Sequence, residues 1–147
     1  MSDDGWETAV AVLRLASQLI DGIQQGVARR GFDDVRPAHG FAFMRIGTGD
    51  ATTAELAEHL GITKQAAAQL VDYLVARKYV ERRPDPRDAR ARLLILTDQG
   101  RSCAAAAESA AAETVDLWKD RLSPLTFSHL HAALTALAEP GRLRPTW

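Results

Sequence analysis

The sequence is poor in cysteine, in long apolar runs and in net charge. Cys103 is its only cysteine, which excludes an intrachain disulfide and a cysteine-based metal cluster. No apolar run approaches the roughly 18 residues of a membrane-spanning helix, and the first residues lack the basic-then-apolar order of a signal peptide. The net charge is only −1, which by itself neither favours nor excludes a nucleic-acid partner. We therefore expect a cytoplasmic protein without a membrane partner.

The sequence also lacks the residue patterns of an enzyme. It contains no glycine-rich phosphate loop, no nucleophile motif and no histidine with paired carboxylates at catalytic spacing. His129 and His131 lie two residues apart in a predicted helix and so point in different directions, whereas paired zinc ligands on a helix need a spacing of about three or four. We predict no catalytic activity, no cofactor and no metal site.

The chain does contain enough apolar residues, 46% of the sequence, to form a core in one domain. A long helix is predicted from Trp6 to about Arg30, and it carries two apolar stripes rather than one. Two stripes imply burial on two sides, which a small domain seldom provides, so this helix favours a partner subunit. A shorter second helix is predicted from Pro37 to about Ile46, because proline suits the first position of a helix.

The next segment has the pattern of a helix–turn–helix. Thr52 and Glu55 have the spacing of a capping box, so a helix should begin there. Gly61 is placed to end that helix in a left-handed conformation, and Thr63 can cap the following helix. Two short helices joined by a tight glycine-containing turn are the usual way to present the second helix to the major groove of DNA.

A predicted β-hairpin follows, which makes the motif a winged one. Its strands are Val80–Arg83 and Leu93–Thr97, on either side of a charged loop, residues 84–89, whose prolines forbid a helix. A second long helix, rich in alanine, runs from Thr97 to about residue 122. Pro124 opens the last helix.

We therefore predict a mainly α fold within one domain, residues 1–147. Long helices for dimerisation, about 1–35 and 98–147, flank a winged helix–turn–helix lobe, about 36–97, whose wing has two or three strands. Between residues 61 and 92 there are eight basic residues against four acidic ones, so the basic charge is concentrated in this lobe. The pattern predicts a DNA-binding regulator.

The predicted recognition helix offers polar side chains on one face. Gln65 and Gln69 can form bidentate contacts to an adenine edge, and Lys64 and the Thr63 hydroxyl lie at the helix N-terminus, where phosphate is favoured. Asp72 would be repelled by phosphate, so we expect contact in the first two turns only. The alternative, a solvated polar surface, is less favoured because the glycine turn and the wing accompany these residues.

In the wing, Arg87 and Arg90 are three residues apart near the predicted tip. Arginine in this position can enter a narrow minor groove, where the negative potential is strongest. We predict that Asp85 supports Arg87 by ion pairing and that Asp88 has a similar task. For Arg90, a contact with DNA and an exposed, self-paired loop are equally good interpretations.

The order and spacing of these segments resemble those of the MarR family of winged-helix regulators. The resemblance lies in Thr53–Ala57, Gly61–Ala67, Leu70–Leu74 and Asp85–Arg90, followed by the strand that ends at Thr97. It implies a homodimer joined by its first and last helices. It also implies that the dimer binds a pseudo-palindromic operator, usually as a repressor, and that a small phenolic or anionic effector releases the dimer from DNA. The residues that this resemblance assigns to DNA binding are Thr63, Lys64, Gln65, Gln69 and Arg87, with Asp85 in support.

His39 and Cys103 lie outside the predicted DNA-binding surface. His39 could line a cavity for the effector, although an ordinary surface histidine is the simpler interpretation. Cys103 should behave as a small apolar residue in its helix, and the peroxide-sensing cysteine that some relatives carry near the N-terminus is absent. The alternative function is a winged helix that binds proteins and has lost DNA binding, and the retained basic and amide residues argue against it.

Overall fold

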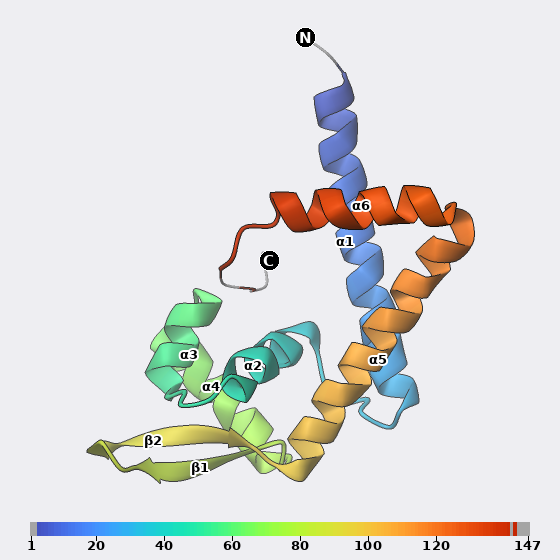
Figure 1. Cartoon of the computed structure of the whole chain (residues 1–147). Coiled ribbons are helices and arrows are strands. Elements are labelled where there is room, and N and C mark those ends of the chain that lie inside the picture. The colour runs from blue at the N-terminus through green and yellow to red at the C-terminus, as the bar shows by residue number, and fades with distance from the viewer. Residues whose placement is uncertain (1–2, 142, 144–147) are drawn as a thin grey trace. The chain divides into compact units, whose positions relative to one another are not determined.

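A computed structural model describes residues 3–141 and residue 143, and Figure 1 shows its helices and one antiparallel hairpin. The elements, in order, are α1 (Asp4–Arg29), α2 (Pro37–Gly47), α3 (Thr53–Leu60), α4 (Lys64–Ala76), β1 (Val80–Asp85), β2 (Asp88–Leu96), α5 (Asp98–Arg121) and α6 (Pro124–Leu137). This is the mainly α, winged helix–turn–helix fold that the sequence predicts.

The described residues form two compact units. The helical unit contains the residues up to Asp33 together with Ala106–Glu139, and the winged lobe contains Asp34–Ala105 with the described residues from Pro140 onward. Helix α5 begins in the winged lobe and ends in the helical unit. The prediction of one domain, with lobe boundaries near residues 36 and 97, stays a prediction.

The predicted caps of the helix–turn–helix are confirmed. The Thr52 hydroxyl accepts a hydrogen bond from the Glu55 backbone N–H at 3.2 Å, and the Glu55 carboxylate accepts one from the Thr52 N–H at 3.1 Å. Gly61 ends α3 with φ 68°, a conformation that glycine adopts without steric cost. Thr63 caps α4 by accepting from the Ala66 N–H at 3.0 Å. These local bonds fix where the two helices begin and end.

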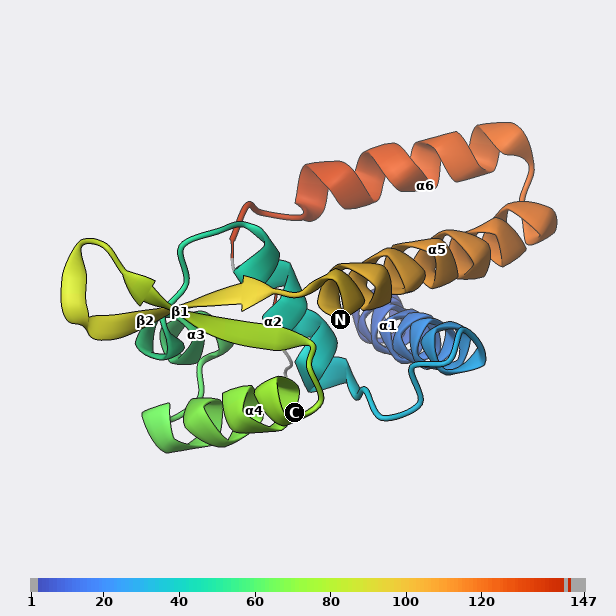
Figure 2. The ribbon, with the colours of Figure 1, turned by 90° about the horizontal axis from the view of Figure 1, so that it is seen from below.

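The wing is longer than predicted. The strands pair from Val80↔Leu96 to Asp85↔Asp88, so the expected loop over residues 84–89 was wrong. Pro84 lies within β1, because a strand of a two-stranded sheet has an edge where the missing N–H costs no ladder bond, and the register shifts directly after it. An isolated bridge, Ala51↔Leu94, adds a short third segment to the hairpin. Figure 2 shows the hairpin extending past the helices of the lobe.

The start of α5 is fixed to the base of the wing. The Thr97 hydroxyl donates to the Lys78 carbonyl at 2.6 Å and accepts from the Gly100 N–H at 3.0 Å. A Cβ atom on Gly100 would lie well inside van der Waals contact of the Tyr79 carbonyl oxygen. One turn further on, Cys103 is fully buried in the lobe, as expected of a small apolar residue.

In the helical unit, small residues let α1 and α5 approach closely. Cβ atoms on Gly22 and Gly26 would collide with the side chains of Thr114 and Ala110. The Arg30 guanidinium donates to the Gly26 carbonyl at 2.9 Å and forms an ion pair with Glu113. The alanine-rich sequence of α5 therefore serves this close helix packing as well as helix propensity.

Candidate nucleic-acid interface

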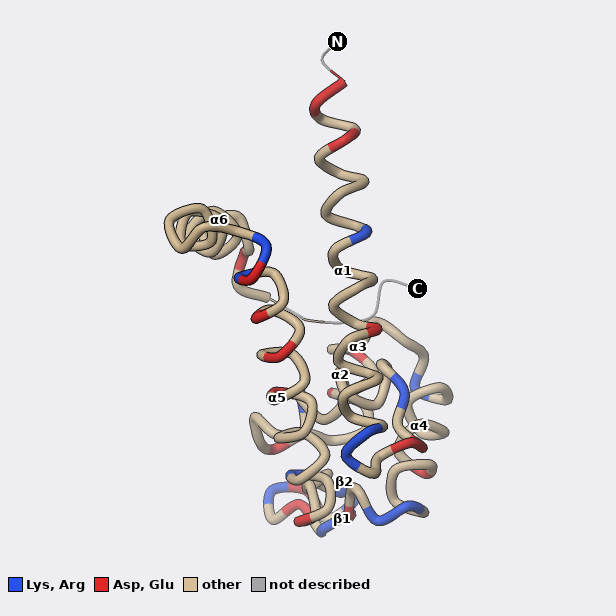
Figure 3. Tube along the Cα trace, turned by 90° about the vertical axis from the view of Figure 1, so that its right-hand side faces the viewer, with Lys and Arg blue, Asp and Glu red and all other residues tan. Residues whose placement is uncertain are grey.

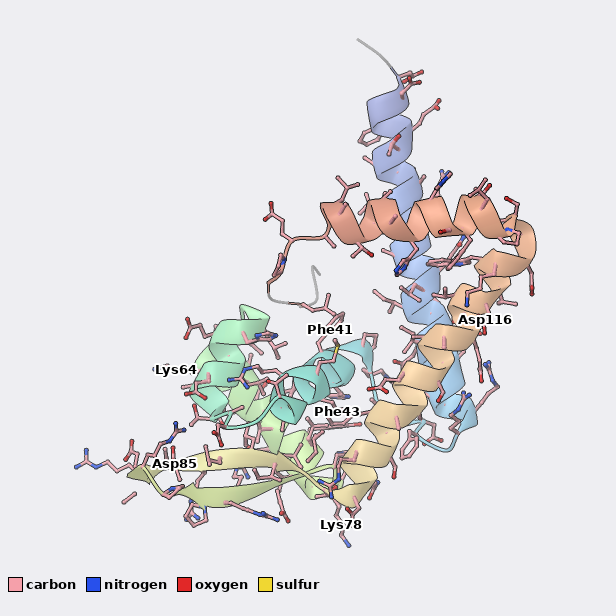
Figure 4. The ribbon with its side chains drawn as sticks, viewed as in Figure 1. Phe41, Phe43, Lys64, Lys78, Asp85 and Asp116 are labelled. Carbon is pink, nitrogen blue, oxygen red and sulfur yellow. The ribbon has the colours of Figure 1, made fainter. Side chains whose placement is uncertain are left out.

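Helix α4 presents the predicted recognition residues at its N-terminal end. Lys64, Gln65 and Gln69 are exposed, while Ala67, Val71 and Leu74 are buried in the lobe. Figure 4 labels Lys64 at the beginning of this helix. The described side chains leave the amides and the lysine open to solvent, as a groove-reading face requires.

Thr63 stands apart from the other predicted contacts, because its hydroxyl oxygen already accepts the capping bond from the Ala66 N–H. Its hydroxyl hydrogen can still be donated to a phosphate oxygen. Thr63 is therefore a helix cap first, and its contact with DNA stays a prediction.

Asp72 has a structural partner that sequence reasoning missed. It is exposed about one turn after Gln69 and forms an ion pair with Arg82 of β1. The pair connects the recognition helix to the wing and balances the acidic charge that we expected only to repel phosphate. The two residues lie ten apart in different elements, so no helical or strand periodicity relates them.

At the wing tip, Asp85 and Arg87 are in contact. Asp85 is 7% exposed, and its Oδ1 atom accepts from the Arg87 backbone N–H at 2.9 Å and lies 3.4 Å from the Arg87 Nε. The backbone bond is that of an Asx turn, which shapes the tip. Arg87 keeps a side chain that is 65% exposed, so Asp85 orients it without covering it. Figure 4 labels Asp85 close to the end of the hairpin.

Other charged residues of the wing lie on the strands themselves. Asp88 accepts a hydrogen bond from the Arg90 backbone N–H at 2.9 Å, so it binds the backbone of Arg90, where we had expected a bond to a guanidinium. Arg83 forms an ion pair with Glu81 on the same strand. Figure 3 shows basic and acidic residues close together in the hairpin. Arg90 is exposed, and its role stays open.

His39 lies in the first turn of α2, half-buried against α4. Its Nδ1 atom accepts from the Arg36 N–H at 2.9 Å, and its ring stacks on Tyr73 with centroids 4.5 Å apart. Burial lowers the pKa of His39, and the positive charges of Arg36 and Arg77 lower it further. The proposed task of lining an effector cavity stays a prediction.

A group of side chains around Asp34 was not found from the sequence. The Tyr79 hydroxyl donates to the Asp34 carboxylate at 2.6 Å, the Tyr73 hydroxyl donates to the Asp34 carbonyl oxygen, and Arg77 Nε lies 3.5 Å from the same carboxylate. Burial, followed by the hydrogen bond to Asp34, raises the pKa of Tyr79 above its usual value. These contacts fix the segment before α2 to the C-terminal half of the recognition helix.

Two further observations concern possible metal ligands and the single thiol of the described residues. No cluster of three or more His, Cys, Asp or Glu side chains within the described part of the chain is arranged to hold a metal ion. Burial raises the pKa of the Cys103 thiol to about 11, so the thiol stays protonated at neutral pH. In the same described residues, no helix is long and apolar enough to cross a membrane.

Comparison with known proteins gives a consistent assignment of the fold. Residues 34–91 match the model of the MarR family. The crystal structure of RV1404 from Mycobacterium tuberculosis is similar over 96% of this chain and 95% of its own, with TM-score 0.81 and 24% identity. Apo MarR from E. coli is similar over 89% of this chain and 96% of its own, with TM-score 0.74 and 19% identity.

One of the similar structures contains nucleic acid. A mutant of MepR from S. aureus, bound to an oligodeoxyribonucleotide, matches with TM-score 0.67 and 19% identity over 88% of this chain and 94% of its own. The comparison with curated proteins gives no match. At these identities the structural likeness establishes the fold, while the family match is confined to the winged lobe.

Proposed function

We propose that the protein is a sequence-specific DNA-binding transcription regulator and not an enzyme, because residues 34–91 match the model of the MarR family. The observation that supports this most is the pairing of two exposed elements in one lobe. Helix α4 presents Lys64, Gln65 and Gln69, and the wing presents Arg87 on a tip shaped by Asp85. An amide-bearing helix for the major groove and an arginine for the minor groove form a complete winged-helix DNA reader.

A homodimer is part of this proposal. Helices α1, α5 and α6 leave large apolar side chains exposed, including Trp6 at 72%, Leu13 at 66% and Leu137 at 79%. Helix α6 contains no Asp, Glu, Lys or Arg, so Figure 3 draws it in tan throughout. A groove of about 140 Å³ between α5 and α6 is lined by Val115, Trp118, Phe127, Leu130, His131 and Leu134. Such an apolar surface supports association with a second copy.

A dimer with two recognition helices would bind a pseudo-palindromic operator in the cytoplasm, with half-sites about 10 base pairs apart. We propose that it acts as a repressor that a small phenolic or anionic effector releases. The operator, the repressor role and the effector are proposed from the family match of residues 34–91.

The competing function is a winged helix that binds another protein. Binding that is unchanged when the recognition residues are replaced would favour this function. The exposed amides of α4 and the arginine of the wing favour DNA, because an amide can read a base edge and a cation attracts phosphate.

The test is a gel shift of the full-length protein with a duplex from its own upstream region and a scrambled duplex. We expect specific binding by the wild type and a loss of about 30-fold or more in the double variant Gln65→Ala, Arg87→Ala, because each contact contributes about 1–3 kcal/mol. Arg121→Ala, an exposed basic residue at the end of α5, is the control and should bind normally. Equal binding by all three proteins would refute the DNA-reading surface.

A further inference from the structure

His39 connects two helices of the winged lobe. It occupies the first turn of α2, where its Nδ1 atom accepts a hydrogen bond from the Arg36 backbone N–H at 2.9 Å. On its other side the imidazole stacks on Tyr73 of α4, with an interplanar angle of 10° and centroids 4.5 Å apart. One side chain therefore caps α2 and packs that helix against the recognition helix.

Tyr73 is the middle layer of a three-part stack. The Arg77 guanidinium carbon lies 3.6 Å from the Tyr73 ring centroid. The imidazole and the guanidinium cannot occupy the same ring face at these distances, so they must cover opposite faces. The Tyr73 hydroxyl donates to the Asp34 carbonyl oxygen, which connects the stack to the segment before α2.

Protonation would break this arrangement at one atom. As a hydrogen-bond acceptor, Nδ1 carries a lone pair and the neutral ring holds its proton on Nε2. A proton added to Nδ1 would face the Arg36 N–H and remove the cap. Among the charged groups around the ring, Arg36 and Arg77 disfavour the imidazolium, while Asp34 favours it.

We propose that His39 is a proton-operated latch of the winged lobe: the neutral imidazole holds α2 to the recognition helix, and protonation releases that hold and weakens DNA binding. Once released, α4 is less rigidly supported, and ordering it again on the operator costs affinity. The latch itself is a property of the lobe, and only its effect on DNA rests on the proposed function.

The sign of the pH dependence follows from the lowered pKa of His39. The unfolded chain takes up this proton near pH 6.5, whereas the folded lobe takes it up only at a lower pH. The stability that the neutral ring contributes is therefore fully present above about pH 6.5, and it is lost as the pH falls toward the folded value.

The decisive variant is His39→Gln. Glutamine at this third helical position is a capping-box residue that can accept the Arg36 N–H bond and does not titrate. His129→Gln is the matched control, because His129 is an exposed histidine of α6. Each protein is melted at one fixed concentration at about pH 7.5 and about pH 5.5, on either side of the titration of an ordinary histidine.

We expect the wild type and His129→Gln to lose about 3–6 °C more on acidification than His39→Gln, the shift that a tenfold change in the unfolding equilibrium produces at this size. Imidazole NMR of the wild type should show His39 titrating below about pH 6.5, the ordinary value for histidine, with its neutral form protonated on Nε2. Equal pH dependence in the wild type and His39→Gln, or a His39 titration at or above about pH 6.5, would overturn the latch.

A second measurement tests the effect on DNA, at constant salt and with a duplex from the upstream region. Between about pH 7.5 and a pH about one unit below the His39 titration seen by NMR, the affinity of the wild type should fall about tenfold relative to that of His39→Gln, which corresponds to about 1.4 kcal/mol. Parallel affinities would overturn the DNA step of the proposal. Failure of both proteins to bind any duplex at either pH would instead refute the proposed function, and the melting data would still decide the latch.

Discussion

The winged lobe and the helical unit treat their apolar side chains in opposite ways. The lobe buries Leu56, Val71, Leu74 and Leu94 completely among its own elements. The helical unit leaves Trp6, Leu13, Leu117, Leu125 and Leu137 more than half exposed. Apolar burial is the main favourable contribution to folding, so the lobe contains its own core, while the helical unit exposes an apolar surface that a second copy would cover in the proposed dimer. In the proposed function, the lobe reads DNA and the helical unit joins two copies of the chain.

The largest expected effect comes from placing a charge on the apolar surface of the helical unit. Leu13→Glu should convert the dimer to a monomer, because burying an unpaired carboxylate in each copy costs several kcal/mol. Sedimentation at micromolar concentration should give twice 16.0 kDa for the wild type and 16.0 kDa for the variant. Leu13→Met, which keeps the apolar surface, should remain dimeric. A dimeric Leu13→Glu variant would place the interface elsewhere.

A cavity in the lobe should have the next largest effect. Leu56 is fully buried in α3, and Leu56→Ala should lower the free energy of unfolding of the lobe by about 2–5 kcal/mol. Urea unfolding measures this change, and sedimentation should still report a dimer. Ile62→Ala, in the exposed turn after α3, is the control and should cost far less. Loss of the dimer together with lobe stability would show that the two units are not separate in the way that their burial suggests.

Within the lobe, single contacts to DNA should be weaker than a core residue. Gln65→Ala should cost about 1–3 kcal/mol on the preferred operator and relax base preference at one position in each half-site. Arg87→Ala should weaken binding to all A·T-rich duplexes and reduce the slope of log affinity against log salt by roughly one for each phosphate charge no longer neutralised. Titrations against the operator and a scrambled duplex at several salt concentrations separate the two responses. Identical responses would show that helix and wing do not read different grooves.

The smallest effect should come from the exposed ion pair between α4 and β1. A double-mutant cycle of Asp72→Ala and Arg82→Ala should give a coupling energy of about 0.2–1 kcal/mol in urea unfolding, since exposed pairs are screened by solvent. Arg83→Ala in place of Arg82→Ala provides the matched cycle and should show no coupling to Asp72, because Arg83 pairs with Glu81. A coupling above about 2 kcal/mol would mean that the pair is more shielded than its exposure indicates.

Local chemistry explains why so much of the lobe could be predicted. The caps at Thr52, Gly61 and Thr63 depend on residues within three positions of one another, so the sequence alone contains the whole interaction. Helical bounds followed from the same signals. The ends of the wing strands did not, because whether Pro84 interrupts a strand depends on which edge of the sheet faces solvent, and this is a property of the folded hairpin.

The contacts around Asp34 and the pair between Asp72 and Arg82 could not be predicted for a related reason. Asp34 and Tyr79 are 45 residues apart, and no periodicity brings a residue before α2 to the hydroxyl of a residue after α4. His39 is the instructive intermediate case. Its position near the start of α2 was correct, but its stacking on Tyr73 and its cap on Arg36 emerged only from the fold.

The tight packing of Gly100 against the Tyr79 carbonyl has a genetic consequence. Any change in the first or second base of a glycine codon adds a side chain or stops the chain, and here even one methyl group would push the first turn of α5 off the base of the wing. Gly100 touches neither of the surfaces proposed to bind DNA or a second copy. Random mutagenesis should nevertheless yield temperature-sensitive alleles at this codon, and suppressors of them should map to the turn around Lys78 and Tyr79, where the backbone can move aside.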